Sequence, residues 1–178
     1  MRETMRYGFI LGFICFLASG ILSVVNGITE PKIKLQKEIE ESLGLKEVMP
    51  QGINFEPKLE EGKIIYYNVY NNTHKLQGFV LKSEAKGYSS NIETLASLNL
   101  NLKIGNVKIL SQNETPGLGS KILAETFLSQ FKEKDLDSFA QVEAITGATI
   151  SSSAVTNAIK DKLLALKSQL VKEIQNAR

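Results

Sequence analysis

The feature that most limits how this chain can fold is an uncharged apolar run near its N-terminus, residues 7–29. As an α-helix rising 1.5 Å per residue, this run would extend about 34 Å, which is enough to cross the hydrocarbon core of a bilayer. Arg2 and Arg6 precede it, and positive charge is retained on the cytoplasmic side of a membrane. The sequence therefore predicts a single-pass protein of the cell (inner) membrane, with a cytoplasmic N-terminus and an extracytoplasmic main domain.

A cleavable signal peptide is the alternative to a retained anchor. Its apolar region usually covers about 7–15 residues and ends at an A-x-A-like cleavage site. The run here is longer and has no clean site of that kind. These observations favour a retained anchor, and in both cases the remaining chain lies outside the cytoplasm.

The composition excludes several kinds of site. Cys15 is the only cysteine, so the chain cannot form an intrachain disulfide, a CxxC redox pair or a cysteine-ligated cluster. His74, the only histidine, lies in a turn-like sequence and belongs to no metal-binding motif. The lysines are scattered among comparable numbers of acidic residues, which is not the pattern of a nucleic-acid surface. We therefore predict no metal site, no catalytic residue of its own and no nucleic-acid partner.

The chain beyond the apolar run divides at changes in its sequence pattern. Pro31 is expected to end the membrane helix, and apolar residues at helical spacing then predict a short second helix that closes at Gly44. Residues 49–62 contain two prolines and two glycines and are predicted to be irregular. We expect an N-terminus with its anchor over residues 1–29, a helical stalk and irregular linker over 30–62, and a folded domain over 63–178.

The pattern within the folded domain predicts an α+β fold. Four runs of branched, aromatic or alternating apolar residues predict a mainly antiparallel sheet with strands over residues 64–70, 76–81, 95–102 and 107–110. A helix with apolar residues Ile122, Leu123, Phe127 and Phe131 is expected after Gly119, and a further strand over 139–145. The last helix, from Ser153 to about Asn176, carries an apolar stripe that is expected to pack on the sheet: Val155, Ile159, Leu163, Leu166, Leu170 and Ile174.

A short motif, Thr146-Gly147-Ala148-Thr149, lies just before this last helix and is followed by three serines at 151–153. Glycine allows a backbone to approach a ligand closely and to adopt positive φ. Serines are common helix caps, and the N–H groups at a helix start favour an anion such as phosphate. Taken alone, the motif is more simply a capping turn than an anion site.

A second motif, Glu114-Thr115-Pro116-Gly117-Leu118-Gly119, follows the last strand of the predicted hairpins. One proline and two glycines within six residues indicate an unusual, tight backbone path into the next helix. A plain strand-to-helix loop and a binding loop both remain open for this segment.

The anchor and these two motifs, in this order and spacing, closely resemble the G subunit of the Rnf electron-transport complex over essentially the whole chain. The C subunit of the sodium-pumping NADH:quinone reductase shares the flavin-attachment element. The resemblance implies that Thr149, the last residue of the [S/T]-G-A-T motif, carries FMN through a phosphoester bond installed by a separate flavin transferase that uses FAD and magnesium. The other candidate cofactor-binding residues belong to the two motifs: Thr146, Gly147, Ala148, Glu114, Thr115, Gly117, Leu118 and Gly119.

The chain departs from the family pattern in three places. Glu143 stands where an aspartate usually precedes the attachment motif, so the charge is kept on a longer side chain. Ser120 stands where an acidic residue often follows G-L-G. The sequence at Gly87-Tyr88 is similar to a family loop, but the usual downstream glycine–proline is missing.

The resemblance implies a flavin-carrying subunit of an ion-translocating oxidoreductase, a translocase that couples ferredoxin and NAD to a sodium or proton gradient. Its partners would be the other membrane subunits and, during maturation, the flavin transferase; we do not expect a stand-alone catalyst. Two alternatives remain at this point. One is a covalent-FMN subunit of another membrane electron chain, such as a sodium-pumping NADH:quinone reductase, and the other is an anchored binding module without a cofactor.

Overall fold

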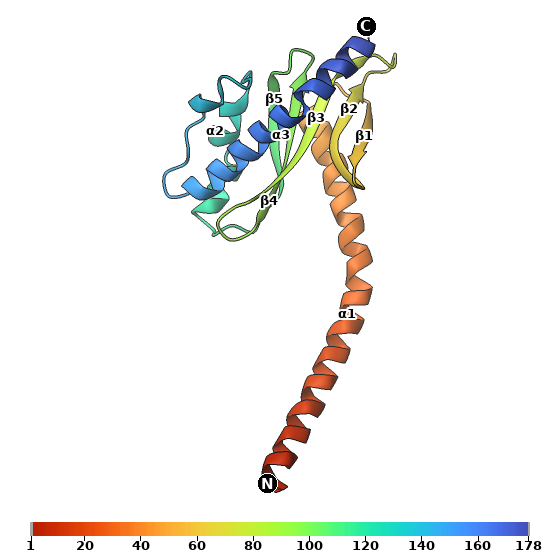
Figure 1. The fold of residues 1–178 in the computed structure, drawn as a ribbon, viewed down its shortest axis with the longest axis vertical. Helices are drawn as coiled ribbons and strands as arrows, with labels where there is room; N and C mark the ends of the chain where they lie inside the picture. Colours follow the sequence, from red (N-terminus) through yellow and green to blue (C-terminus); the bar gives the residue numbers. More distant parts are fainter. Residues whose placement is uncertain (1, 178) are drawn as a thin grey trace. The chain divides into compact units, whose positions relative to one another are not determined.

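The computed structural model describes the backbone of residues 2–177 and the side chains of residues 4–177. It divides into two compact units, Met1–Glu40 and Glu41–Arg178. Helix α1 (Arg2–Val48) forms the first unit as far as Glu40. Its last turns, from Glu41 onward, belong to the second unit. The second unit is an α+β domain whose antiparallel sheet and helices are seen in Figure 1.

Helix α1 contains the predicted membrane span. Among the residues that the structure describes, it is the one helix long and apolar enough to cross a membrane. The large apolar side chains of residues 7–29, such as Phe9, Phe16 and Leu22, are exposed along it. A helix with this surface needs an apolar surrounding, so the prediction of an N-terminal membrane-spanning helix agrees with the structure.

The predicted helix ends at Pro31 and Gly44 are both wrong, because α1 continues through both residues to Val48. A proline in a helix interior costs about 3 kcal/mol. The helical turns on either side of Pro31 keep their hydrogen bonds, and together these stabilise α1 by more than this cost. Gly44 has a packing role instead. A Cβ atom there would lie 2.7 Å from Cδ2 of Leu110 and 3.1 Å from Cδ1 of Leu95, so glycine lets the end of α1 rest closely on the sheet.

The sheet has five antiparallel strands in sequential order: β1 (Asn54–Glu60), β2 (Lys63–Tyr70), β3 (Leu76–Lys86), β4 (Asn91–Asn99) and β5 (Ile104–Ser111). The four predicted strands correspond to β2–β5. Strand β1 was predicted to be irregular, which is wrong. It contains Pro57, pairs only with β2 and exposes most of its residues, as an edge strand can.

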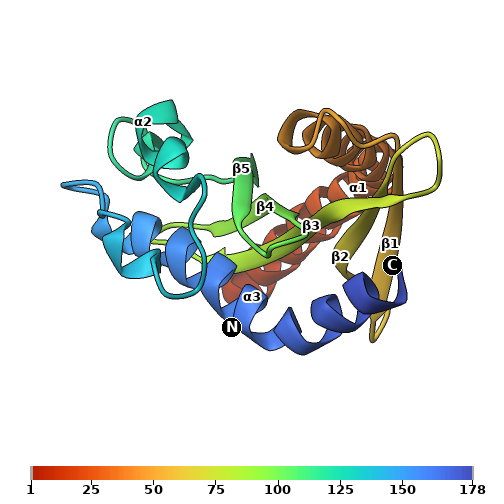
Figure 2. The same cartoon turned by 90° about the horizontal axis from the view of Figure 1, so that it is seen from above.

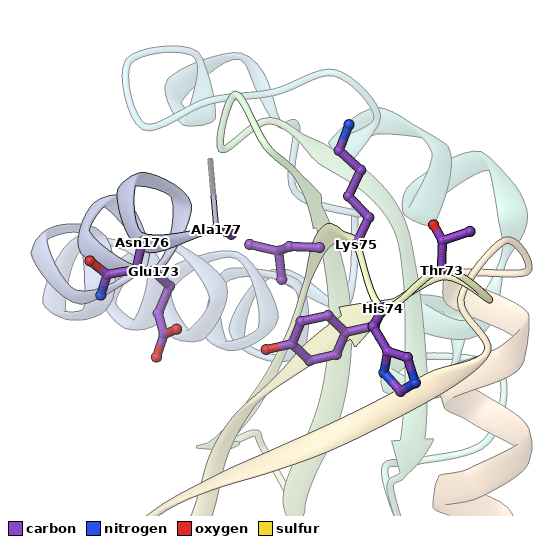
Figure 3. A pocket seen from close by; sticks show the side chains of 8 residues that line it. Thr73, His74, Lys75, Glu173, Asn176 and Ala177 are labelled. Carbon is purple, nitrogen blue, oxygen red and sulfur yellow. The ribbon is translucent and has the colours of Figure 1, made fainter.

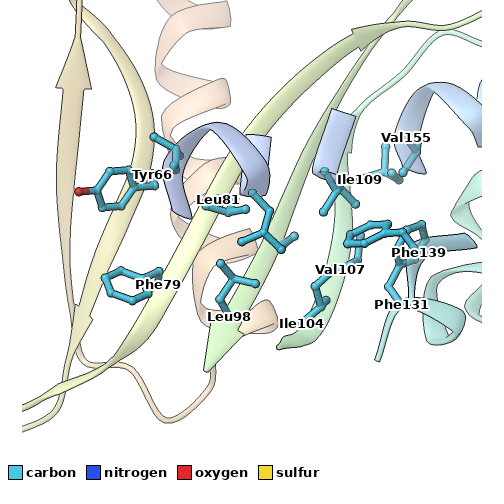
Figure 4. Packing of buried hydrophobic residues seen from close by; sticks show 14 of the residues in the cluster. Tyr66, Phe79, Leu81, Leu98, Ile104, Val107, Ile109, Phe131, Phe139 and Val155 are labelled. Atoms are coloured by element: carbon cyan, nitrogen blue, oxygen red, sulfur yellow. The ribbon is translucent and has the colours of Figure 1, made fainter. Parts of the chain in front are cut away.

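Each face of the sheet is covered by a different helix. Helix α3 (Thr149–Asn176) lies along one face (Figure 2) and buries its stripe of Val155, Ile159 and Leu163 in the main core. Figure 4 shows side chains of this core between the sheet and the helices, among them Phe79, Leu98, Phe131 and Phe139. On the other face, Leu45 and Val48 from the end of α1 pack with Tyr67, Val69, Val80 and Leu95.

The connection between β5 and α3 is built from short helices. It contains η1 (Gly119–Leu123), α2 (Glu125–Leu128), η2 (Ser129–Phe131) and η3 (Phe139–Gln141). The predicted single helix after Gly119 is therefore broken, and the predicted strand over 139–145 is wrong. The amide of Gln130 pairs with Glu143, accepting from its N–H at 2.8 Å and donating to its carbonyl at 3.5 Å. A side chain thus supplies to this segment the hydrogen bonds that a neighbouring strand would have supplied.

Two hairpin turns at one end of the sheet share the same hydrogen-bond pattern. In each, an asparagine (Asn71 or Asn99) accepts at Oδ1 from the N–H groups two and four residues later. The fourth residue of each turn has positive φ: +54° at His74 and +58° at Leu102. L-residues adopt this conformation at a cost of about 1–2 kcal/mol. Leu102 offsets the cost by packing against the main core, whereas His74 is exposed.

His74→Gly is expected to stabilise the domain by about 0.5–1 kcal/mol, because glycine adopts positive φ without strain and its extra freedom in the unfolded chain offsets only part of the gain. Leu102→Gly is the matched change and should destabilise, because it also removes buried apolar surface. Urea unfolding of the detergent-solubilised chain measures both. Equal effects of the same sign at the two positions would contradict this explanation.

Candidate functional site

The 146–149 motif forms the turn that leads into α3. Gly147 has φ of +81°, which favours glycine, and Thr149 is the first residue of the helix. The N-cap position is occupied by Ala148, which is buried and makes no side-chain capping hydrogen bond. The predicted capping role of the serines is therefore wrong, because the helix starts four residues before Ser153. Thr149 is left at the exposed first position of a 28-residue helix.

Two of the serines that follow are buried in the first turn of α3. Ser152 accepts a hydrogen bond from the N–H of Ile145 at 3.2 Å and donates to the carbonyl of Ala148 at 2.7 Å. Its hydroxyl thus closes the turn that contains the motif. Ser151 is also buried and donates to Glu114 at 2.6 Å, across 37 residues of sequence.

The 114–119 motif folds into a tight loop that ends at η1. Gly117 has φ of +75°, and the carbonyl of Thr115 accepts from the N–H groups of Leu118 and Ser120 at 3.2 and 3.3 Å. Ser120 closes the loop by accepting from the N–H of Gly117 at 2.9 Å. The residue that departs from the family pattern therefore has a local structural role here.

Glu114 points into the protein and is only 5% exposed. Its carboxylate accepts hydrogen bonds from the backbone N–H groups of Tyr88, Ser89 and Ser90 at 3.0–3.1 Å, and from the hydroxyl of Ser151. The side chain therefore joins three segments: the 87–90 loop between β3 and β4, the 114–119 loop, and the first turn of α3. Groups of the protein itself therefore use the hydrogen-bonding capacity of this carboxylate.

Two glycines leave the space that this carboxylate fills. A Cβ atom at Gly87 would lie 2.6 Å from Oε1 of Glu114, and one at Gly119 would lie 2.7 Å from Oε2. Real Cβ atoms do not approach so closely, so both positions require glycine for a steric reason. A methyl group built on Gly147 would be 3.6 Å from Cδ2 of Leu118, so the two motifs lie close to each other.

The pKa of Glu114 reflects these contacts. Burial raises the pKa, but the hydrogen bonds from Ser151 and from the Ser90, Ser89 and Tyr88 N–H groups outweigh it, so the pKa lies below its usual 4.5. The native state then binds this proton less tightly than the unfolded state. The stabilising contribution is fully present above pH 4.5 and is lost as the pH falls through the lower native pKa.

Acid unfolding is therefore expected to depend on Glu114. The wild-type melting temperature should fall below about pH 4.5, the range that this lowered pKa defines. Glu114→Gln should be less stable at neutral pH and should lose less stability across the acid range. Asp135, whose pKa is lowered chiefly by the Ser138 hydroxyl, titrates in both proteins and therefore cancels in the comparison. Parallel pH profiles for the two proteins would contradict the assignment.

The surface around Thr149 combines a free hydroxyl with apolar side chains. Within the part of the chain that the structure describes, the Thr149 and Thr146 hydroxyls make no hydrogen bond. Ile150 and Leu118 are 56% and 49% exposed, and Tyr88, on the loop that Glu114 joins to α3, is 69% exposed. The described residues contain no cluster of side chains that could hold a metal ion. An accessible nucleophilic hydroxyl beside apolar surface suits the attachment of a planar aromatic group through a phosphate.

The remaining candidates are distributed as follows. Thr115 is exposed, and its hydroxyl lies 3.5 Å from that of Ser89, so the 114–119 and 87–90 loops meet there as well. Glu143 is exposed and contacts Gln130 only through its backbone. Sequence reasoning missed the roles of Ser151, Ser152 and the 87–90 backbone. If the apolar stripe of α3 is continued one turn toward the start of the helix, it reaches Ser151 and Ser152. This pattern could have indicated that both serines are buried.

A separate polar pocket lies at the opposite end of α3. It has a volume of about 370 Å³ and is formed by the β2–β3 turn and the last turn of the helix. Figure 3 shows His74 and Lys75 on the turn, with Glu173 and Asn176 on the helix. The pocket contains no residue of either motif, so it is not part of the candidate site.

Comparisons with known proteins identify what the chain is similar to. The model of the FMN-binding domain family matches residues 87–164, a range that contains all three segments joined by Glu114. The G subunit of the proton-translocating ferredoxin:NAD(+) oxidoreductase complex of Clostridium ljungdahlii is 32% identical over 160 residues, covering 85% of each chain. The G subunit of the ion-translocating oxidoreductase complex of Methanosarcina acetivorans is 29% identical, covering 82% of this chain and 85% of its own.

The fold also matches a solved structure. The crystal structure of NqrC from Shewanella oneidensis superposes with a TM-score of 0.52 at 20% identity, covering 69% of this chain and 73% of that one. This likeness shows a shared fold.

Proposed function

Since this chain belongs to the family of G subunits of ion-translocating oxidoreductase complexes, we propose that it relays electrons within such a complex through FMN linked to Thr149. The complex would couple electron transfer between ferredoxin and NAD to ion translocation across the membrane. The observation that carries the proposal is the position of Thr149, an exposed threonine with a free hydroxyl at the start of α3, inside the FMN-binding domain.

The residues around Thr149 fit such a group. A phosphoester on its oxygen would lie at the start of a helix, where N–H groups without helical partners favour negative charge. Gly147 has no side chain to obstruct the approach of a ligand, and the exposed Leu118 and Ile150 offer apolar surface for a flavin ring. When bound, FMN supplies reversible one- and two-electron transfer, and the protein supplies its position and surroundings. Thr149 acts as a tether in turnover.

The proposed location and partners follow from the charges around the apolar run and from the family of the chain. Arg2 and Arg6 precede the apolar run, and the positive-inside tendency therefore supports a cytoplasmic N-terminus with the flavin domain outside the cytoplasm. Covalent attachment is useful there, because a dissociated cofactor would be diluted away. The partners are the other membrane subunits of the complex, and a flavin transferase acts during maturation.

The direct test is the intact mass of the full chain co-expressed with its flavin transferase. The expected mass increment is that of FMN less one water, with a fluorescent band on a denaturing gel. An unmodified mass and a dark band would reject the flavoprotein and favour a cofactor-free anchored module. A quinone-reductase subunit is the other candidate; the solved structure shares the fold alone, whereas 32% identity over 85% of the chain favours the G subunit family.

A further inference from the structure

The 87–90 loop has the form of an anion receptor. Successive backbone N–H groups that converge on one point bind anions well. Here three in a row, from Tyr88, Ser89 and Ser90, converge on the carboxylate of Glu114. The hydroxyls of Ser90 and Ser151 also donate to it, at 3.3 and 2.6 Å. Gly87 and Gly119 lack side chains that would otherwise meet this carboxylate, because a Cβ atom at either position would lie only 2.6–2.7 Å from its oxygens.

We propose that Glu114 is a positioning residue for the flavin site, an internal anion whose occupancy of this receptor fixes the 87–90 loop against the start of α3. The inference deepens the proposed function and rests on it. Ser151, the receptor's contribution from α3, is two residues after Thr149. The carboxylate therefore sets where the attachment residue lies relative to the loop that carries the exposed ring of Tyr88.

The other side-chain hydrogen bonds of the loop lead back to the segment around Glu114. Ser90 accepts from the N–H of Asn113 at 2.7 Å, and the Ser89 hydroxyl lies 3.5 Å from that of Thr115. Glu114 supplies the hydrogen-bonded connection from the loop through to Ser151 on α3. Because an internal carboxylate occupies the loop N–H groups, the phosphoryl group at Thr149 is left to the N–H groups of the first helical turn.

The test is chemical rescue of Glu114→Ala in the full chain. The purified, unmodified chain is incubated with flavin transferase and FAD, and the rate of covalent flavin loading is measured with and without formate. Loading should fall about tenfold, since several hydrogen bonds to a charged group are lost. Formate, which has the size and charge of the missing carboxylate, should restore it. Neutral formamide should not.

Matched variants separate positioning from general damage. Glu125→Ala removes an exposed glutamate of α2 and should load like the wild type. Ser151→Ala removes a single receptor bond and should slow loading, whereas Ser153→Ala, two residues along, should not. In variants loaded to completion, the fluorescence anisotropy of the flavin should be lower in Ser151→Ala than in Ser153→Ala, because the loop no longer restrains the site.

Normal loading in Glu114→Ala, or a folded Glu114→Ala whose defect formate does not reduce, overturns the inference. If Glu114→Ala does not fold, equal loading and anisotropy in Ser151→Ala and Ser153→Ala overturn it, and a difference supports it. A wild type that takes no flavin rejects the proposed function instead. The receptor is then tested separately, because formate should still raise the melting temperature of Glu114→Ala and leave that of Glu125→Ala unchanged.

Discussion

Thr149→Ala is expected to abolish covalent flavin loading while leaving the domain folded. The hydroxyl that would form the phosphoester is removed, and no other atom of residue 149 can replace it. The side chain is exposed and makes no hydrogen bond in the described structure, and surface substitutions of this kind change stability by about 0.5 kcal/mol or less. The measurement is flavin fluorescence on a denaturing gel, together with intact mass and the melting temperature.

The control is Thr146→Ala, which changes the other exposed threonine of the motif. Thr146 lies before the helix and is separated from Thr149 by Gly147 and Ala148, so the variant should keep its fluorescent band. A band that persists in Thr149→Ala and disappears in Thr146→Ala would move the attachment to the first threonine. A band in both would point to the serines at 151–153, of which Ser151 and Ser152 are buried.

The hairpins were predictable from sequence because their signals are local. Branched and aromatic runs separated by turns rich in asparagine, glycine or serine indicate β2–β5 directly, and the apolar stripe indicates the face of α3 that packs on the sheet. Strand β1 gave no such signal. It lies at the edge, contains Pro57 and exposes most of its side chains, so its hydrophobic alternation is weak.

The candidate site was predictable only in part, because only some of its features depend on residues that are close together in the sequence. Glycines and hydroxyls near a helix start can be read from a few residues, and both motifs were found in that way. The orientation of Glu114 depends on backbone groups 24–26 residues earlier and on Ser151, 37 residues later. The local sequence pattern does not contain these partners, so it could not show that Glu114 is buried where three segments meet.

The second large effect concerns the end of α1. Glu41 belongs to the compact domain, and its carboxylate accepts from Nζ of Lys82 at 2.7 and 2.8 Å and from the hydroxyl of Tyr67. Burial and this hydrogen bond with Glu41 raise the pKa of Tyr67. Leu45 and Val48 are almost fully buried on the same face of the sheet. Residues that the sequence assigns to a stalk thus complete one of the two cores.

A chain that starts at residue 49 is therefore expected to be far less stable than one that starts at residue 41. It exposes the face that Leu45 and Val48 cover, at about 1.5–3 kcal/mol for each side chain. It also leaves Lys82 without its partner; because the two side chains are still 25% and 17% exposed, losing this ion pair adds about 1 kcal/mol. The total of at least about 4 kcal/mol is close to the whole stability of a marginally stable domain.

Urea unfolding and soluble yield of the two truncated chains measure this difference. Leu45→Ala and Glu41→Gln in the longer chain should each reproduce a part of it. Equal unfolding midpoints for the two truncations would mean that the sheet does not need this cover, and the folded domain would then begin after α1. Loss of folding in the shorter chain alone would place the start of the flavin domain within the helix that carries the membrane span, so that one continuous helix serves both units.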